Sequence, residues 1–217
     1  ESNESISAIL AIKNFDEDSY LFLTTRNGMV NRMSLSSFKK VRNSGLKAIL
    51  LKNNDYLFNA LHTSGNDKII LSSTSGKSIM FSESQIRERS RGTQGVTGIK
   101  LPKETKIISS LNIQCSQLIF VTENGFGNKI SVDSYNEQNR GGQGVISIKT
   151  SDRNGLVVGA VNLENTDYII LITNKGKTIK ISASDMKTIN RNTQGVRLQD
   201  MSDDEKISAV SSERAND

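Results

Sequence analysis

The amino-acid sequence predicts an all-β, propeller-like fold built from four repeats, each with about 50 residues and about four strands. The first observation is a series of glycines at expected hairpin turns, spaced by 48, 49 and 51 residues: Gly28, Gly76, Gly125 and Gly176. A second series, spaced by 50, 49 and 51 residues, comprises Gly45, Gly95, Gly144 and Gly195. The third observation is that no long stretch has the 3.6-residue periodicity of an amphipathic helix. Four-stranded blades around an axis bury their faces against one another, so the repeat favours this architecture.

Each repeat is expected to open with a β-hairpin whose turn carries a glycine of the first series. In the first repeat we expect strands over 20–25 and 29–35, joined by Arg26-Asn27-Gly28. An Asn-Gly pair between two such runs is among the strongest short hairpin signals. A basic turn over 39–45 follows, and then strands over 47–51 and 56–62.

The later repeats keep this order of hairpin, basic turn and two further strands. We expect their strands over 68–73, 77–81, 96–101 and 107–113, over 118–122, 129–132, 145–149 and 156–163, and over 168–173, 177–181, 196–198 and 207–210. The repeats then span about 20–63, 68–113, 117–163 and 168–213 of a single domain over 1–217. A run over 6–12 matches the closing strands. We therefore expect an orphan N-terminal strand and interpret the chain as a fragment of a larger array.

Positive charge is concentrated in the body of the chain. The net charge is +5, but residues 19–199 carry 25 Lys and Arg against 12 Asp and Glu, whereas both ends are acidic. A basic body is typical of proteins that bind a polyanion such as nucleic acid, and the alternative is an ordinary solvated surface. No apolar run approaches the roughly 20 residues that a membrane helix needs, so no membrane partner is expected.

Chemistry that depends on cysteine or histidine is not expected. Cys115 is the only cysteine and cannot form an internal disulfide, which fits a reducing cytoplasm. His62 is the only histidine, so a zinc site or a His-based triad lacks partners. The sequence also has no P-loop. We expect a non-catalytic domain with no metal site and no cofactor.

The basic turns are the candidate binding site. The most regular of them reads Gln138, Asn139, Arg140, Gly141, Gly142, Gln143 and Gly144. Glycines let the backbone approach a phosphate or another backbone closely, and an arginine presents a planar fork of donors that suits phosphate oxygens. Degraded copies of this heptad stand at the same place in the other three repeats.

Cations recur at three places in the repeat, which would spread them along a path, as binding to nucleic-acid phosphates requires. The turns carry Lys39, Lys40, Arg42, Arg87, Arg89, Arg91, Arg140, Lys187 and Arg191. The position four residues after the hairpin glycine carries Arg32, Lys129 and Lys180, and the segment after the turn adds Lys47, Lys100, Lys149 and Arg197. We predict that this set contacts DNA. The alternative for each member alone is a solvated charge that blocks edge-to-edge sheet aggregation.

Aromatic residues make up 5% of the chain and are not interleaved with the basic turns. Stacking on unpaired bases is therefore not favoured, and duplex is a better partner than a single strand. Phe38, Ile86, Tyr135 and Met186 stand just before the four basic turns. We expect them to be apolar anchors of the core, so Tyr135 is not expected to be a DNA-cleaving tyrosine.

Three longer motifs carry a resemblance to a known family. They are N-R-G-G-Q-G-V-I-S-I-K at 139–149, R-N-G-L-V-V-G-A-V at 153–161 and R-N-T-Q-G-V at 191–196. With these motifs in register, residues 5–210 resemble the C-terminal domain of the A subunit of bacterial DNA gyrase. The resemblance implies a β-pinwheel of about six blades that binds, bends and wraps duplex DNA around a basic rim for negative supercoiling. It also implies a cytoplasmic, nucleoid-associated protein whose partners are the remainder of the gyrase A subunit, together with the gyrase B subunit, which would carry strand breakage and ATP hydrolysis.

The signature heptad of that family, the gyrase box, departs from the turn found here. It reads Q-R-R-G-G-[RK]-G and lies in the first blade, whereas Asn139 and Gln143 replace basic residues and the heptad lies in the third repeat. The resemblance therefore implies that this turn is a box-like counterpart and that the true box lies upstream of residue 1. Two alternatives stay open: the corresponding domain of topoisomerase IV, and a propeller that binds proteins rather than DNA.

Overall fold

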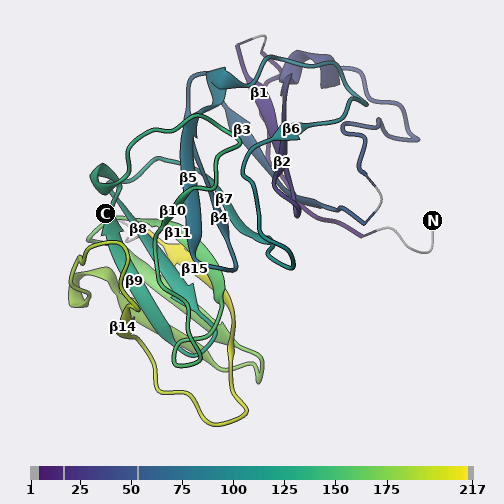
Figure 1. The fold of residues 1–217 in the computed structure, drawn as a ribbon. Coiled ribbons are helices and arrows are strands. Elements are labelled where there is room, and N and C mark those ends of the chain that lie inside the picture. Colours follow the sequence, from purple (N-terminus) through teal and green to yellow (C-terminus); the bar gives the residue numbers. More distant parts are fainter. Residues whose placement is uncertain (1–4, 17, 53, 215–217) are drawn as a thin grey trace.

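The computed structural model describes residues 5–16, 18–52 and 54–214, which form a curved row of small antiparallel sheets (Figure 1). These residues contain fifteen strands, and their only helices are four 3₁₀ turns of three or four residues. The all-β expectation is confirmed. No helix among them has the length and hydrophobicity that crossing a bilayer requires.

Four sheets correspond to the four expected blades. Blade 1 has the order β3 (Leu57–Thr63), β1 (Tyr20–Thr25), β2 (Met29–Ser34) and β6 (Val96–Thr97). Blade 2 has the order β7 (Ile107–Asn112), β4 (Lys68–Ser73), β5 (Lys77–Ser82) and β10 (Val145–Ile146). Blade 3 has the order β11 (Val157–Leu163), β8 (Gln117–Thr122), β9 (Phe126–Ser131) and β14 (Val196–Arg197). Blade 4 has the order β15 (Ile207–Glu213), β12 (Tyr168–Thr173) and β13 (Thr178–Ser182).

Each outer strand is exchanged between repeats. The chain leaves the second repeat to place β6 beside β2 of blade 1, and the third repeat places β10 beside β5 of blade 2. In the same way β14 of the fourth repeat completes blade 3. Blades 1 to 3 therefore each contain three strands of one repeat and a fourth strand from the next, whereas blade 4 has three strands among the described residues. The sequence did not indicate this exchange.

Two expected strands are wrong. Residues 6–12 form no strand, although they match the closing strands β3, β7, β11 and β15 in sequence. Each of those strands pairs with the first hairpin strand of its own repeat, and no such strand lies before residue 6 among the described residues. Residues 47–51 form no strand and make only an isolated bridge between Ile49 and Thr93, because no earlier blade offers an edge in the described part of the chain.

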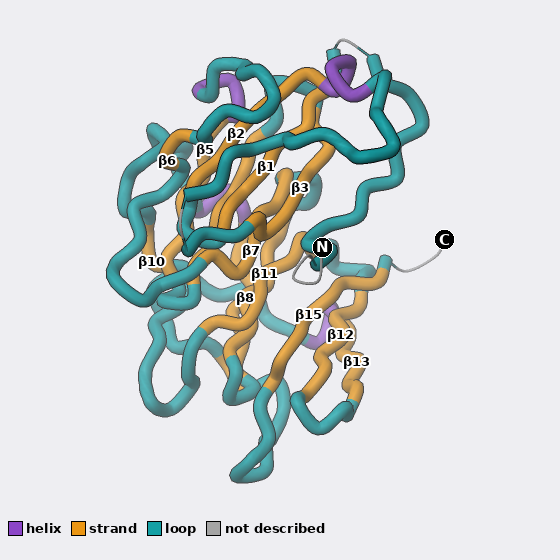
Figure 2. Tube along the Cα trace, turned by 90° about the vertical axis from the view of Figure 1, so that its right-hand side faces the viewer, coloured by secondary structure: helices purple, strands orange, loops and turns teal. Residues whose placement is uncertain are grey.

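The closing strands lie on the inner side of the row and the exchanged strands on its outer side. β7 contacts β3 and β11, and β11 contacts β15, so the closing strands follow one another. Figure 2 shows them passing through the middle of the view, with β6 and β10 at one margin. The basic turns precede β6, β10 and β14, so they lie along the outer edge.

Burial follows from this stacking of blades. Each hydrophobic core lies between two consecutive blades: Phe22 and Leu71 share the first core, Ile70 and Phe120 the second, and Ile119 and Leu171 the third. The middle blades are covered on both sides, so β4 and β8 are buried at nearly every position. In β12 exposure alternates along the strand, because blade 4 has a neighbour on one side only among the described residues.

A serine begins each 3₁₀ turn and directs the chain from the second hairpin strand to the outer edge. Ser34, Ser82, Ser131 and Ser182 each accept a hydrogen bond from the backbone N–H two residues later, at 3.3 Å. The turns that follow are η1 (Leu35–Phe38), η2 (Glu83–Gln85), η3 (Val132–Ser134) and η4 (Ala183–Asp185). A serine oxygen is a preferred cap for an N–H group that a helix start leaves unpaired.

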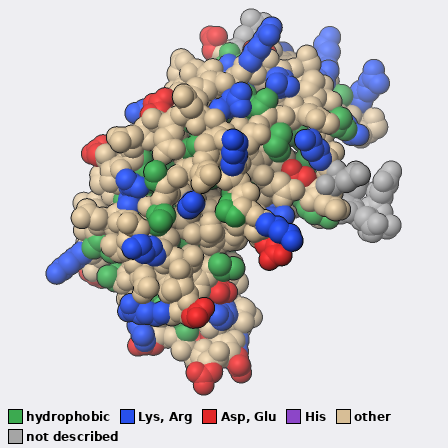
Figure 3. Space-filling view, viewed as in Figure 1, with side chains coloured by type: hydrophobic (Ala, Val, Ile, Leu, Met, Phe, Trp, Pro, Cys, Tyr) green, Lys and Arg blue, Asp and Glu red, His purple; other side chains and the backbone are tan. Residues whose placement is uncertain are grey.

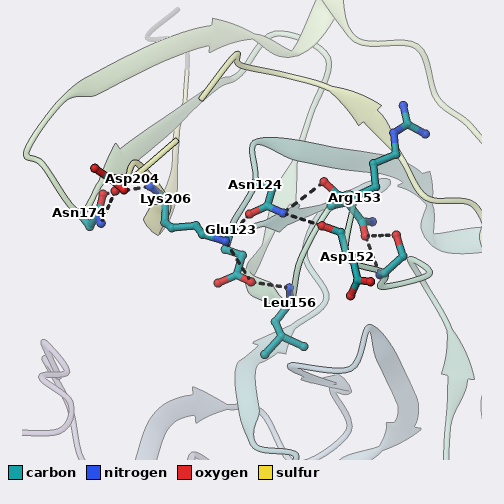
Figure 4. A network of polar contacts seen from close by, with 10 residues as sticks. Glu123, Asn124, Asp152, Arg153, Leu156, Asn174, Asp204 and Lys206 are labelled. Carbon is teal, nitrogen blue, oxygen red and sulfur yellow. Dashed lines mark hydrogen bonds and ion pairs between the residues drawn. The ribbon is translucent and has the colours of Figure 1, made fainter. Parts of the chain in front are cut away.

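Polar contacts at the hairpin turns join neighbouring repeats (Figure 4). The Asn124 amide donates within the third repeat to the carbonyls of Asp152 and Arg153 at 3.2 Å, and its oxygen accepts from the ammonium of Lys206, in the fourth repeat, at 2.5 Å. Glu123 accepts from the Leu156 N–H and lies 3.6 Å from the Lys206 ammonium. The first two blades have an equivalent contact, in which Lys106 donates to Asn27 at 2.7 Å.

The hairpin glycines test how closely the exchanged segment is packed. Gly76 and Gly176 occupy equivalent turns at φ +76° and +79°, a conformation that costs an L-residue roughly 1–2 kcal/mol. A Cβ on Gly76 would overlap the carbonyl oxygen of Ile148, whereas nothing lies within 4 Å of one on Gly176. We expect Gly76→Ala to lower the urea midpoint of unfolding clearly more than Gly176→Ala, because only the first adds a clash. Equal decreases would show that the segment after Gly144 does not pack on this turn in solution.

Candidate nucleic-acid interface

The basic turns form a continuous ribbon along the outer edge, joined by backbone hydrogen bonds. We call the outer ribbon the three segments 39–50, 87–100 and 136–149 and the last turn, 187–197. Between the second and third segments the Gly141 N–H donates to the Gly98 carbonyl at 2.6 Å, and the Lys100 N–H donates to the Gly142 carbonyl at 2.8 Å. The first and second are joined in the same way, and the third and last by a bond from Lys149 to Thr193 at 2.7 Å. Side chains on the ribbon are thereby held at regular intervals.

The ribbon is also fixed to the blade beneath it. The N–H of Arg89 donates to the carbonyl of Arg32, that of Gln138 to Met80, and that of Ile189 to Lys129, at 2.8–2.9 Å. These three donors stand six residues before the second glycine of their repeats. The second glycines let the ribbon backbone lie close to the backbone of the blade. A Cβ on Gly144 would overlap the Ser78 carbonyl oxygen, and a Cβ on Gly95 would lie 2.6 Å from the Val30 carbonyl oxygen.

Two arginines of the turns clamp neighbouring repeats together. The Arg140 guanidinium donates to the carbonyls of Gln85 at 3.2 Å and Thr97 at 3.1 Å. The equivalent Arg191 donates to the carbonyls of Ser134 at 3.0 Å and Ile146 at 3.4 Å. Both side chains are half-buried. Part of their donor capacity is thus used within the fold, a role that the sequence pattern does not indicate.

Arginines of the ribbon also cover the few aromatic rings nearby. The Arg191 guanidinium lies 5.1 Å from the centre of the Tyr135 ring, and that of Arg91 lies 5.9 Å from the Phe38 ring. The contact with Phe38 places a guanidinium where a base would otherwise stack, and the Tyr135 ring is itself buried.

The expected anchors are largely confirmed as core residues. Ile86, Tyr135 and Met186 are buried, whereas Phe38 is half-buried. The Tyr135 hydroxyl, in a residue 5% exposed, donates to Ser147 at 2.7 Å, and that serine donates to Ser78 at 2.9 Å. Burial raises the pKa of the Tyr135 phenol, so this group stays neutral and serves packing.

Lys129 does not lie on the surface, which corrects its expected place on the binding path. The residue is 4% exposed, and its ammonium donates to Asn165 at 2.9 Å and to the carbonyls of Ala183 at 2.8 Å and Met186 at 3.0 Å. Burial lowers the pKa of this ammonium. The side chain joins blade 3 to the fourth repeat and is not available to a phosphate.

The two other cations at this position are accessible but engaged. Arg32 is half-buried, donates to the Gly65 carbonyl at 2.8 Å and lies 4.7 Å from the Tyr20 ring. Lys180 is exposed, forms a 2.7 Å ion pair with Glu213 and lies 4.3 Å from a tyrosine ring.

Most of the predicted cations are exposed. Besides Lys180, they are Lys39, Lys40, Arg42, Lys47, Arg87, Arg89, Arg91, Lys100, Lys149, Lys187 and Arg197. Arg197 is paired with Asp200. Figure 3 shows Lys and Arg side chains spread over one face of the molecule, with several Asp and Glu side chains gathered at its lower end. The exposed cations are a multipoint surface rather than a pocket, as a long polyanion requires.

Two cations near the ribbon are not among those predicted from the sequence to contact DNA. Lys77 begins β5, opposite Ile146 of the exchanged strand, and Arg153 lies 4.8 Å from the Phe126 ring beside Arg197. Lys77 directly follows a hairpin glycine in the sequence. This position indicates a place beside the ribbon only when the strand exchange is known, because the exchanged strand brings the ribbon to it. Within the part of the chain that the structure describes, no three His, Cys, Asp or Glu side chains form a group that could hold a metal ion.

Comparisons with known proteins agree with this architecture. A family model described as the DNA gyrase C-terminal domain, beta-propeller, matches residues 19–64, 67–113, 116–163 and 167–212. The DNA gyrase A subunits of Salmonella typhimurium and Escherichia coli K12 are each 38% identical over 208 residues, which cover 95% of this chain and 24% of the relative. The chain thus spans about a quarter of the length of these relatives.

Solved structures give the same result. A DNA gyrase A C-terminal domain matches with a TM-score of 0.86 and 28% identity, covering 98% of this chain and 71% of that one. The C-terminal domain of a DNA topoisomerase IV also matches with a TM-score of 0.86, at 26% identity and 93% and 64% coverage. The fold alone does not separate these two alternatives, whereas the family model and the sequence relatives confirm the resemblance to gyrase.

The clamp predicts that Arg140 contributes to stability through its shape and not its charge. We expect Arg140→Lys to lower the free energy of unfolding by about 1–3 kcal/mol, because lysine cannot reach both carbonyls with a planar fork. Arg87→Lys is the matched control, since Arg87 is exposed and no contact of its side chain is found among the described residues. Thermal and urea unfolding of the two variants measure the difference. A destabilisation by Arg87→Lys as large as that by Arg140→Lys would contradict the clamp.

Proposed function

The chain belongs to the family of DNA gyrase C-terminal β-propeller domains, and from this premise we propose that its outer ribbon binds duplex DNA independently of sequence. DNA follows the ribbon from one repeat to the next and is bent and wrapped there. The wrapped DNA is presented to a type II topoisomerase core for negative supercoiling. The remainder of the gyrase A subunit, together with the gyrase B subunit, supplies strand breakage and ATP hydrolysis, so this domain acts without catalysis, in the bacterial cytoplasm at the nucleoid.

One observation carries the proposal: exposed cations recur in register on a hydrogen-bonded ribbon that passes across all four repeats. A path of spaced cations neutralises successive phosphates, whereas a single pocket would suit a small anion. The ion pairs found among the described residues involve Lys180, Arg197 and Lys206, all of the fourth repeat. Exposed cations of the first three repeats have no ion pair among the described residues, so their charge is available for a partner.

The site also favours backbone contact over base reading. The rings of Phe38 and Tyr135 are covered by arginines of the chain, so they offer no platform for unstacked bases. Phosphate contacts carry no sequence information, which suits a protein that wraps whatever sequence it meets.

The second repeat supplies the sharpest test. We expect the triple variant Arg87→Ala, Arg89→Ala, Arg91→Ala to weaken binding to a mixed-sequence duplex and to flatten the slope of log affinity against log salt by up to ~2.7, at about 0.9 for each phosphate that is no longer neutralised. Fluorescence anisotropy over a salt series measures both effects. The control removes the same charge from outside the ribbon, at the exposed Lys68, Lys103 and Lys175.

The outcomes separate the ribbon from general charge. Retained circular dichroism excludes unfolding as the cause of weaker binding. An unchanged slope in the arginine variant, or an equal decrease in the control, would place the DNA path elsewhere. A wild-type chain that does not bind duplex at low salt would overturn the proposed function.

A further inference from the structure

A cleft on the outer side of the molecule lies where three consecutive repeats meet. It has a volume of about 510 Å³. Its lining comes from the second repeat through one residue, from the third through four and from the fourth through three: Lys77, Ser134, Gly144, Val145, Ile146, Asn190, Arg191 and Asn192. The strand exchange produces this meeting, because β10 of the third repeat lies between β5 and the turn of the fourth.

The lining has the chemistry of an anion site. Two of its side chains are cationic, none is acidic, and the asparagine amides are further donors. The Arg191 guanidinium is held by the carbonyls of Ser134 and Ile146 and by the Tyr135 ring. These contacts use two of its nitrogens and leave N–H groups for a ligand, in an orientation that is already fixed. A fixed donor loses less entropy when it binds.

Lys77 distinguishes this cleft from its counterparts. It pairs with Ile146 in the register in which Met29 pairs with Thr97 of blade 1 and Phe126 with Arg197 of blade 3. A lysine thus stands where the neighbouring blades have apolar side chains. No ion pair or side-chain hydrogen bond of the Lys77 ammonium is found among the described residues, so its charge is uncompensated there.

We propose that this cleft seats one phosphate of the duplex backbone, held between the Lys77 ammonium and the free N–H groups of Arg191. The inference rests on the proposed function and deepens it, because it names one contact of the DNA path. It also adds a cation outside the ribbon, on the blade beneath it. A seat made by three repeats holds DNA at a fixed place relative to all three, whereas an exposed ribbon cation extends from one repeat only.

The repeats allow two matched variants. One removes the lysine from the cleft, and the other adds a lysine at the equivalent position of blade 1. Lys77→Gln should flatten the slope of log duplex affinity against log salt by about 0.9, the contribution of one phosphate. Met29→Lys places a cation at the equivalent point of blade 1, beneath Arg140, and should steepen the slope by about the same amount. Lys68→Gln is the charge control, since Lys68 is exposed at the first residue of β4 and outside the cleft lining. Fluorescence anisotropy with a mixed-sequence duplex over a salt series measures the slope for all three variants.

A further arm identifies the ligand. Inorganic phosphate at matched ionic strength is added to both proteins without duplex. If Lys77→Gln loses phosphate binding that the wild type shows, while the salt slope of its duplex affinity is unchanged, the cleft is a site for free anions and the proposal is wrong. An unchanged salt slope of duplex affinity in Lys77→Gln, or equal flattening in Lys68→Gln, also overturns the phosphate seat. If both variants still bind duplex normally, the proposed function stands without the seat. Absence of binding in the wild type overturns both.

Discussion

The structure depends on one constraint: the outer edge of a blade is completed by backbone from the next repeat. A sheet edge presents a row of unpaired N–H and C=O groups, and natural proteins cover or pair such rows. Here Ser147 and Ile148 of the third repeat donate to the Gly76 carbonyl of the second, and Gly98 of the second donates to the Gly28 carbonyl of the first. A repeat therefore supplies the outer strand of the preceding blade and depends on the next repeat for its own. Stability is shared between adjacent repeats rather than held within each.

This constraint also explains why the cations are divided between folding and binding. A turn that lies across two blades needs side chains that bridge them, and Arg140 and Arg191 supply planar forks that reach two carbonyls each. Residues nearer the start of the turn, such as Arg87 and Lys187, have no such task and extend into solvent. Equal spacing in the sequence thus conceals two classes of cation, one that builds the ribbon and one that is free for a partner.

The features set by local chemistry could be predicted from the sequence. The period of the glycines gave the number of blades, and the turns at Gly28, Gly76, Gly125 and Gly176 have the positive φ that hairpins of this kind require. The exchange could not be predicted, because β6, β10 and β14 are two residues long and pair with strands of another repeat. The burial of Lys129 was missed for the same reason: its three acceptors lie 36, 54 and 57 residues away in the chain. A pattern along one strand does not reveal what a later repeat places over it.

The cations of the ribbon are paired with acidic side chains at one end only, so the proposed DNA path attracts DNA more strongly at its other end. In the fourth repeat Arg197 is paired with Asp200 and Lys180 with Glu213, and Asp203 and Asp204 follow in the loop after β14. The paired acids lie well within one Debye length, roughly 10 Å, of their cations, so they weaken attraction to a polyanion at physiological salt. Exposed cations of the first and second repeats have no such partners among the described residues. Most of the counterion release that drives binding would then come from the first three repeats, and the cleft beside Lys77 lies where this strongly attracting part of the ribbon meets the compensated part.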